Sequence, residues 1–146
     1  MDKLIVSACL CGVKCRYDGS DNAVPGLVRL WKEGRAIAFC PEEGGGLPTP
    51  RPPCEIIGGN VIDKNGEDKT SAFEKGGRMM LKLAEEHGAK KAVLKESSPS
   101  CGVNFIYDGS FSGKKIEGRG IAAALLHENG IEIISEKEFM EEKLNR

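Results

Sequence analysis

The hydrophobic pattern alternates between two periods along the chain. Four short apolar runs predict buried strands, because they are rich in β-branched residues or bounded by turn signals; they span residues 3–7, 36–39, 89–94 and 131–134. Four other segments repeat apolar residues at helical spacing and predict helices; they span residues 25–32, 70–87, 118–129 and 136–144. Ser135 is expected to cap the last helix. This alternation of strand and helix is typical of an α/β fold.

These elements predict a Rossmann-like open sheet of about four parallel strands, with helices on both faces because the crossovers are right-handed. We expect the spatial order second, first, third, fourth strand. That order places a topological switch between the first and third strands, where their loops diverge to form a crevice. Apolar pairs on either side of Gly58-Gly59-Asn60 predict a small extra β-hairpin. Residues 40–53, rich in proline and glycine, are expected to form a rigid loop, with neither helix nor central strand.

Length and composition narrow the class of protein. The 146 residues are expected to form a single domain, 1–146, with 40% hydrophobic and 29% charged residues as in ordinary globular proteins. A net charge of -1 and a pI of about 6.2 give no indication of a nucleic-acid or membrane partner. Because the N-terminus shows no signal peptide, we expect a cytoplasmic protein, in which cysteines more often bind metals or act in catalysis than form disulfides.

Three of the six cysteines stand in the same local setting. Cys9, Cys40 and Cys101 each follow a predicted strand, directly or through a short loop. Because ligands bind at the carboxyl ends of parallel strands, we expect these sulfurs to converge. Three thiolates suit zinc with a bound water, or a four-iron cluster with one iron left free as a Lewis acid. Their spacing does not distinguish these metals, and three small buried hydrophobic residues remain the structural alternative.

Other residues near these cysteines are weaker candidates. Glu42, two residues after Cys40, is placed to shuttle protons near a metal, or is an ordinary loop acid. Ser98 and Ser100 are candidate hydrogen-bond donors to a substrate or to sulfur. Three further cysteines read more simply as loop thiols, although the first two could join Cys9 in a local metal loop: Cys11, Cys15 and Cys54.

Several motifs together resemble a known family over nearly the whole chain. In order, they are Ser7-Ala8-Cys9-Leu10-x-Gly12, Cys15-Arg16-Tyr17-Asp18-Gly19, Cys40-Pro41-Glu42, Gly45-Gly46-Leu47-Pro48-Thr49-Pro50-Arg51, Ser98-Pro99-Ser100-Cys101-Gly102 and Gly118-Arg119-Gly120. This set resembles the family of small cysteine-motif domains, formerly of unknown function, that includes thiouracil desulfidase.

The resemblance implies a [4Fe-4S] cluster held by Cys9, Cys40 and Cys101, with one open iron site. The implied reaction is desulfuration without redox change, from C=S to C=O with release of hydrosulfide. The implied substrate is a thiolated pyrimidine such as thiouracil, or a related small thioamide. Glu42 and Ser100 match family motifs and are our candidates for proton transfer and substrate positioning, although the family's acid could equally align with Glu43.

Two other classes of function stay open at this point. One is a non-catalytic module that binds metal or sulfur or senses redox state, and the other is a zinc hydrolase. Release of hydrosulfide separates the enzyme from the binding module, and elemental analysis separates iron from zinc. The sequence leaves the oligomeric state and the natural substrate undetermined.

Overall fold

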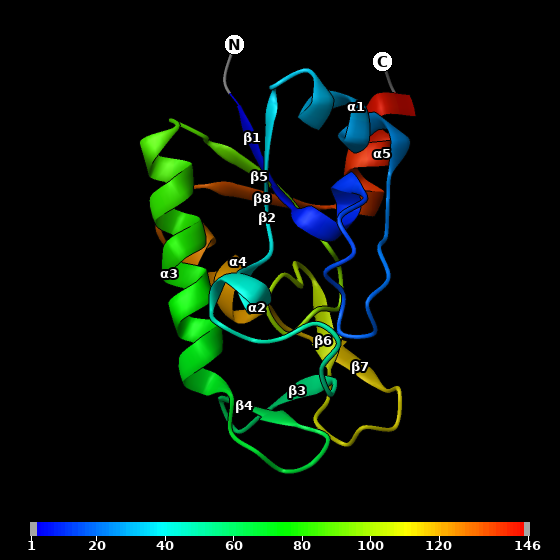
Figure 1. Ribbon diagram of the computed structural model, residues 1–146, viewed down its shortest axis with the longest axis vertical. Helices are drawn as coiled ribbons and strands as arrows, with labels where there is room; N and C mark the ends of the chain where they lie inside the picture. The colour runs from blue at the N-terminus through cyan, green and yellow to red at the C-terminus, as the bar shows by residue number, and fades with distance from the viewer. Residues whose placement is uncertain (1–2, 145–146) are drawn as a thin grey trace.

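A parallel sheet of four strands forms the centre of the computed structural model, which describes residues 3–144 (Figure 1). The strands are β1 (Leu4–Ser7), β2 (Ala36–Phe39), β5 (Lys91–Leu94) and β8 (Glu132–Ser135). They lie in the order β2-β1-β5-β8, and every pair is parallel. This confirms the predicted fold class and strand order, with the topological switch between β1 and β5.

Helices cover both faces of this sheet, as predicted (Figure 1). Alternate strand residues point to opposite faces. Ile5 and Leu94 therefore pack with α3 (Thr70–Glu86) and α4 (Ile121–Glu128). Val6 and Val93 pack on the other face, with α1 (Pro25–Lys32) and α5 (Glu136–Leu144). Burial on both faces explains why the strands are short continuous apolar runs. Within residues 3–144, no helix combines the length and apolar character that crossing a membrane requires.

Two antiparallel ribbons lie beyond the carboxyl ends of the sheet strands (Figure 1). The first is the predicted hairpin, β3 (Cys54–Ile57) with β4 (Asn60–Asp63). Gly58 and Gly59 form its turn with φ values of 57° and 85°, which glycine adopts at little cost. The second pairs β6 (Phe105–Tyr107) with β7 (Lys115–Glu117). Both ribbons add walls around the end of the sheet where the predicted site lies.

The expectation that residues 40–53 contain no helix is wrong. A short helix, α2 (Pro41–Gly44), follows Cys40 directly. Proline at the first helical position has its φ already set and lacks only an N–H that would be unpaired there. The helix also packs against α3 at Gly76, where an added Cβ would lie 1.7 Å from the Pro41 carbonyl oxygen. Tertiary contact therefore stabilises a helical turn that the local composition disfavours.

The N-terminal ends of the last two helices, α4 and α5, have identifiable causes. Helix α4 begins at Ile121 rather than at residue 118, because the backbone at Gly120 is extended, with a ψ of 164°, and forms the N-cap. A Cβ at Gly120 would lie 2.4 Å from the Ser100 carbonyl carbon. Ser135 caps α5 as predicted, since its Oγ accepts the N–H of Glu138 at 3.2 Å. The Glu138 carboxylate accepts the N–H of Ser135 in return, which completes a capping box.

Candidate active site

The three strand-end cysteines line one cavity of about 200 Å³ at the carboxyl ends of the sheet strands. Cys9 lies in a 3-10 helix, Ala8–Cys11, that continues β1. Cys40 sits between β2 and α2, and Cys101 comes from the loop that follows β5. Glu42 and Ser100 line the same cavity. The structure thus brings together all five residues that the sequence proposed for the site.

Local hydrogen bonds fix the Cys101 loop. The Ser98 hydroxyl accepts the backbone N–H groups of Ser100 at 3.1 Å and Cys101 at 3.0 Å. One carboxylate oxygen of Glu96 accepts four more backbone N–H groups of this loop, at 2.8 to 3.2 Å: those of Ser97, Val103, Asn104 and Phe105. The loop that carries Cys101 is therefore held in place from within.

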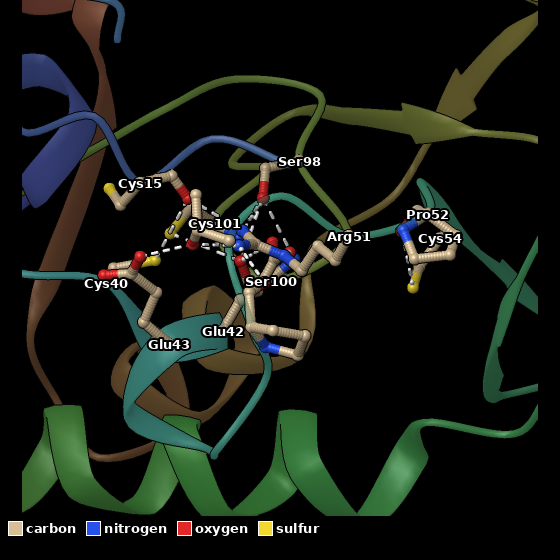
Figure 2. A network of polar contacts seen from close by, with 12 residues as sticks. Cys15, Cys40, Glu42, Glu43, Arg51, Pro52, Cys54, Ser98, Ser100 and Cys101 are labelled. Carbon is tan, nitrogen blue, oxygen red and sulfur yellow. Dashed lines mark hydrogen bonds and ion pairs between the residues drawn. The ribbon is translucent and has the colours of Figure 1, made fainter. Parts of the chain in front are cut away.

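Glu42, Arg51 and Ser100 form a buried polar network beside the cysteines (Figure 2). Arg51 Nε donates to Glu42 Oε1 at 3.0 Å, and the two side chains are only 5% and 13% exposed. Ser100 Oγ donates to Glu42 Oε2 at 2.8 Å and lies 3.7 Å from Cys101 Sγ. Arg51 Nη2 also donates to the Cys15 carbonyl oxygen at 2.9 Å. The network links a carboxylate, a hydroxyl and a thiol within one wall of the cavity.

The surroundings of the three cysteine thiols differ. Burial raises the pKa of Cys101 to about 12. A hydrogen bond with the Cys15 side chain lowers the pKa of Cys40 to about 7, and one with the same side chain lowers the pKa of Cys9; the single thiol proton of Cys15 serves one of these two sulfurs at a time. Asn22 Nδ2 adds a hydrogen bond to Cys9 Sγ at 3.6 Å. Two of the three thiols therefore sit where their anionic form is stabilised.

The weaker cysteine candidates separate in the structure. Cys15 lines the cavity, and hydrogen bonds to Cys40 and Cys9 raise its own pKa. Cys11 is buried against α1, with its Sγ 3.9 Å from the Leu27 carbonyl oxygen, so it does not accompany Cys15 into the cavity. Cys54 borders the cavity from β3, and burial raises its pKa to about 12.

Sequence reasoning missed several residues that line the cavity, among them Asn22, Lys95, Tyr107 and Lys115. Lys95 directly follows β5, and its position at a strand's carboxyl end was a usable signal. Tyr107 and Lys115 come from the β6–β7 ribbon, where they lie opposite each other in the register. Nothing in their local sequence distinguishes them from surface hairpin residues.

Comparison with known proteins gives a consistent picture. The 2-thiouracil desulfurase family matches residues 4–138. The chain belongs to this family. It is 46% identical to the uncharacterized protein YbbK of Bacillus subtilis (strain 168), over 93% of this chain and 97% of the relative. A solved structure, the [4Fe-4S]-dependent thiouracil desulfidase TudS, is also 46% identical, with a TM-score of 0.93, and the match covers 99% of this chain and 97% of that one. The resemblance noted in the sequence is confirmed.

The donor set in this member of the 2-thiouracil desulfurase family fits an iron–sulfur cluster. Cys9, Cys40 and Cys101 reach one cavity from three separate segments that each follow a sheet strand, and thiolates are the usual ligands of such clusters. The charges of Cys9 and Cys40 both raise the pKa of Cys101, so the three sulfurs are electrostatically coupled. Bound metal would offset the repulsion between the three negatively charged thiolates, because the positive metal ions attract all of them.

Proposed function

We propose that this protein converts the C=S group of a thiolated pyrimidine such as thiouracil, or of a related small thioamide, to C=O. Water supplies the oxygen and sulfur leaves as hydrosulfide, so no net oxidation or reduction occurs. One observation carries this proposal: three cysteines from distant segments share a cavity with a buried Glu42–Ser100 hydrogen bond. Membership of the 2-thiouracil desulfurase family confirms the prediction of an enzyme that removes sulfur.

Cys9, Cys40 and Cys101 are our proposed ligands for a [4Fe-4S] cluster. A cluster held by three cysteines keeps one iron open and supplies a thiophilic Lewis acid for the substrate sulfur. The chain's own contribution is to hold the three sulfurs on loops fixed by the sheet. Asn22 supports this role by donating a hydrogen bond to Cys9 Sγ, and Cys15 supports it by donating its one thiol proton to either Cys9 or Cys40.

Glu42 and Ser100 are our proposed residues for proton transfer and substrate positioning. The Ser100 hydroxyl donates a hydrogen bond to Glu42 Oε2, so a carboxylate and a hydroxyl face the cavity as one unit. Glu42 accepts a proton from the attacking water, and Arg51 holds the carboxylate in place during that transfer. Ser100 Oγ, between Glu42 and Cys101 Sγ, orients the polar edge of the substrate.

Cysteine substitutions test the proposed cluster. Protein reconstituted anaerobically with iron and sulfide should show the broad visible absorbance of an iron–sulfur cluster and release hydrosulfide from thiouracil. Cys9→Ser, Cys40→Ser and Cys101→Ser should each lose both signals. Cys54→Ser, which borders the same cavity from β3, should keep both. Stoichiometric zinc in a colourless active protein would instead favour a zinc hydrolase, and a cluster without turnover would favour a binding module.

Adjacent glutamates give a matched test of the proton-transfer role. Glu42→Gln should lower kcat by about 10²- to 10⁴-fold, the usual contribution of general acid–base catalysis. Glu43→Gln makes the same chemical change one residue away and should leave kcat near the wild-type value, because the exposed Glu43 bonds to Thr49 rather than to Ser100. Visible absorbance should persist in both variants. A large kcat loss in Glu43→Gln alone would reverse the assignment.

The remaining proposals concern context. A free small molecule is our proposed substrate, rather than a nucleic acid, and the net charge of -1 supports that choice. The cytoplasm is our proposed location, because thiolate ligands need reduced cysteines and the cytosol keeps thiols reduced. We further propose that residues 1–146 act as one domain, since helix α3 contacts both α2 beside the cavity and α4 on the sheet.

A further inference from the structure

A second set of metal-binding atoms lies at the edge of the cavity and shares only Cys40 with the proposed cluster ligands. The Sγ atoms of Cys15 and Cys40 and a carboxylate oxygen of Glu43 all lie within 4.8 Å of one another. Figure 2 shows these side chains at the end of the polar network away from Cys54. Glu43 has no part in the proposed function, and Cys15 enters it only as a hydrogen-bond donor to the cluster ligands, not as a ligand itself.

The three donors suit a thiophilic divalent cation. Zinc takes cysteine sulfur at about 2.3 Å and carboxylate oxygen at about 2.0 to 2.2 Å, usually in tetrahedral sites, which places ligand atoms roughly 3.3 to 3.8 Å apart. The ligand atoms, at most 4.8 Å apart, need to approach one another by no more than about 1.5 Å to reach that separation. Two sulfurs and one oxygen leave a fourth position for water. Hard cations such as magnesium prefer oxygen ligands and fit this set poorly.

The surrounding structure holds each donor in place. Cys40 precedes α2, and Glu43 lies three residues later in that helix, so both come from one short element. The Thr49 hydroxyl donates to a Glu43 carboxylate oxygen and orients it, as outer partners of metal ligands commonly do. Arg51 Nη2 donates to the Cys15 carbonyl oxygen at 2.9 Å and fixes that backbone beside α2.

We propose that Cys15, Cys40 and Glu43 bind a zinc-like divalent cation in protein that lacks the cluster, and that this ion competes with cluster assembly. Binding displaces the thiol protons and forms two metal–sulfur bonds and one metal–oxygen bond, with no change in oxidation state. The metal site itself is independent of the proposed function. Only the competition rests on it, because it requires Cys40 to be a cluster ligand.

Cobalt titration of the cluster-free protein, under reducing conditions, tests the site. The wild type should bind one Co²⁺ with the sulfur-to-cobalt charge-transfer absorbance of a thiolate site, and zinc should displace it. Cys15→Ser should lose most of that absorbance, and Glu43→Gln should weaken binding at least about tenfold. Because Glu43 is exposed, that variant should fold normally, which circular dichroism checks.

Two cysteines outside the proposed set of Cys15, Cys40 and Glu43 serve as matched controls. Cys101→Ser and Cys54→Ser should bind Co²⁺ as the wild type does, although both residues line the same cavity. If Cys101→Ser abolishes cobalt binding while Cys15→Ser and Glu43→Gln leave it unchanged, the ion occupies the cluster ligands and the proposal is wrong. Equal cobalt affinity in all the variants also overturns it.

Reconstitution after zinc loading tests the competition. One equivalent of zinc added before iron and sulfide should lower the cluster yield of the wild type, and Glu43→Gln should restore it. An unchanged yield, with zinc still bound, overturns the competition and leaves the site intact. If the wild type forms no cluster under any condition, the proposed function fails, whereas the cobalt titration still decides the metal site.

Discussion

The Glu96 carboxylate offers a quantitative test of how the Cys101 loop is held. Glu96 is half-buried, and one of its oxygens accepts four backbone N–H groups of the loop. Its second oxygen accepts Asn104 Nδ2 at 2.9 Å. Burial by itself would raise the pKa of Glu96, but hydrogen bonds from Asn104 and Phe105 outweigh it and lower the pKa below 4.5. The carboxylate form therefore stabilises the fold.

Glu96→Gln keeps one acceptor oxygen, removes the charge and places an NH₂ group opposite the Asn104 donor. Hydrogen bonds to charged groups contribute about 1.5–3 kcal/mol, against about 0.5–1.5 kcal/mol for neutral ones. Because one oxygen is shared by four donors and the group is partly exposed, we discount the sum and expect a loss of about 2 kcal/mol. That loss corresponds to a Tm about 4–8 °C lower for a chain of this length.

Urea unfolding of the cluster-free wild type and of Glu96→Gln across pH measures this loss. The pKa of Glu96 is lower in the folded than in the unfolded state, so its contribution is complete well above pH 4.5 and declines as pH falls through the folded pKa. The difference in unfolding free energy should thus be constant near neutral pH and shrink in acid. Glu74→Gln makes the same chemical change at an exposed position of α3, and it should alter neither the unfolding free energy at neutral pH nor its dependence on pH. A difference that is absent at neutral pH, or undiminished in strong acid, would refute the reasoning.

Two further predictions concern packing and the polar network. Gly76→Ala should destabilise the protein by about 3 kcal/mol or more, because the new Cβ would meet the Pro41 carbonyl oxygen at 1.7 Å. Gly77→Ala, with its nearest contact at 3.3 Å, should change stability by less than about 1 kcal/mol. Thermal unfolding of the two variants measures the difference, and equal losses of stability would contradict it. Arg51→Lys keeps the charge but loses most of the donors that Arg51 directs at Glu42 and at neighbouring carbonyl groups, so we expect a loss of about 2–3 kcal/mol in urea unfolding. A stability equal to wild type would show that the ion pair's charge alone matters there.

Much of the fold was predictable because its signals are local. The four apolar runs and the helical periodicities lie within single elements, and parallel packing with right-handed crossovers leaves few arrangements of them. The predicted strand order then placed Cys9, Cys40 and Cys101 at one end of the sheet, where the structure has them. The Ser135 cap was predictable for the same reason, since both members of the capping box lie within four residues.

The tertiary structure alone decided which side chains meet in the cavity. Glu42 and Ser100 are 58 residues apart, and only packing of α2 against α3, and of the Cys101 loop against Gly120, brings them within 2.8 Å. Packing of α2 against α3 also made a helix of residues whose composition disfavours one. Cys11 is buried against α1 whereas Cys15 lines the cavity, although only four positions separate them in the sequence. Periodicity records which face of an element is buried, but a contact between two loops depends on the position of every element between them.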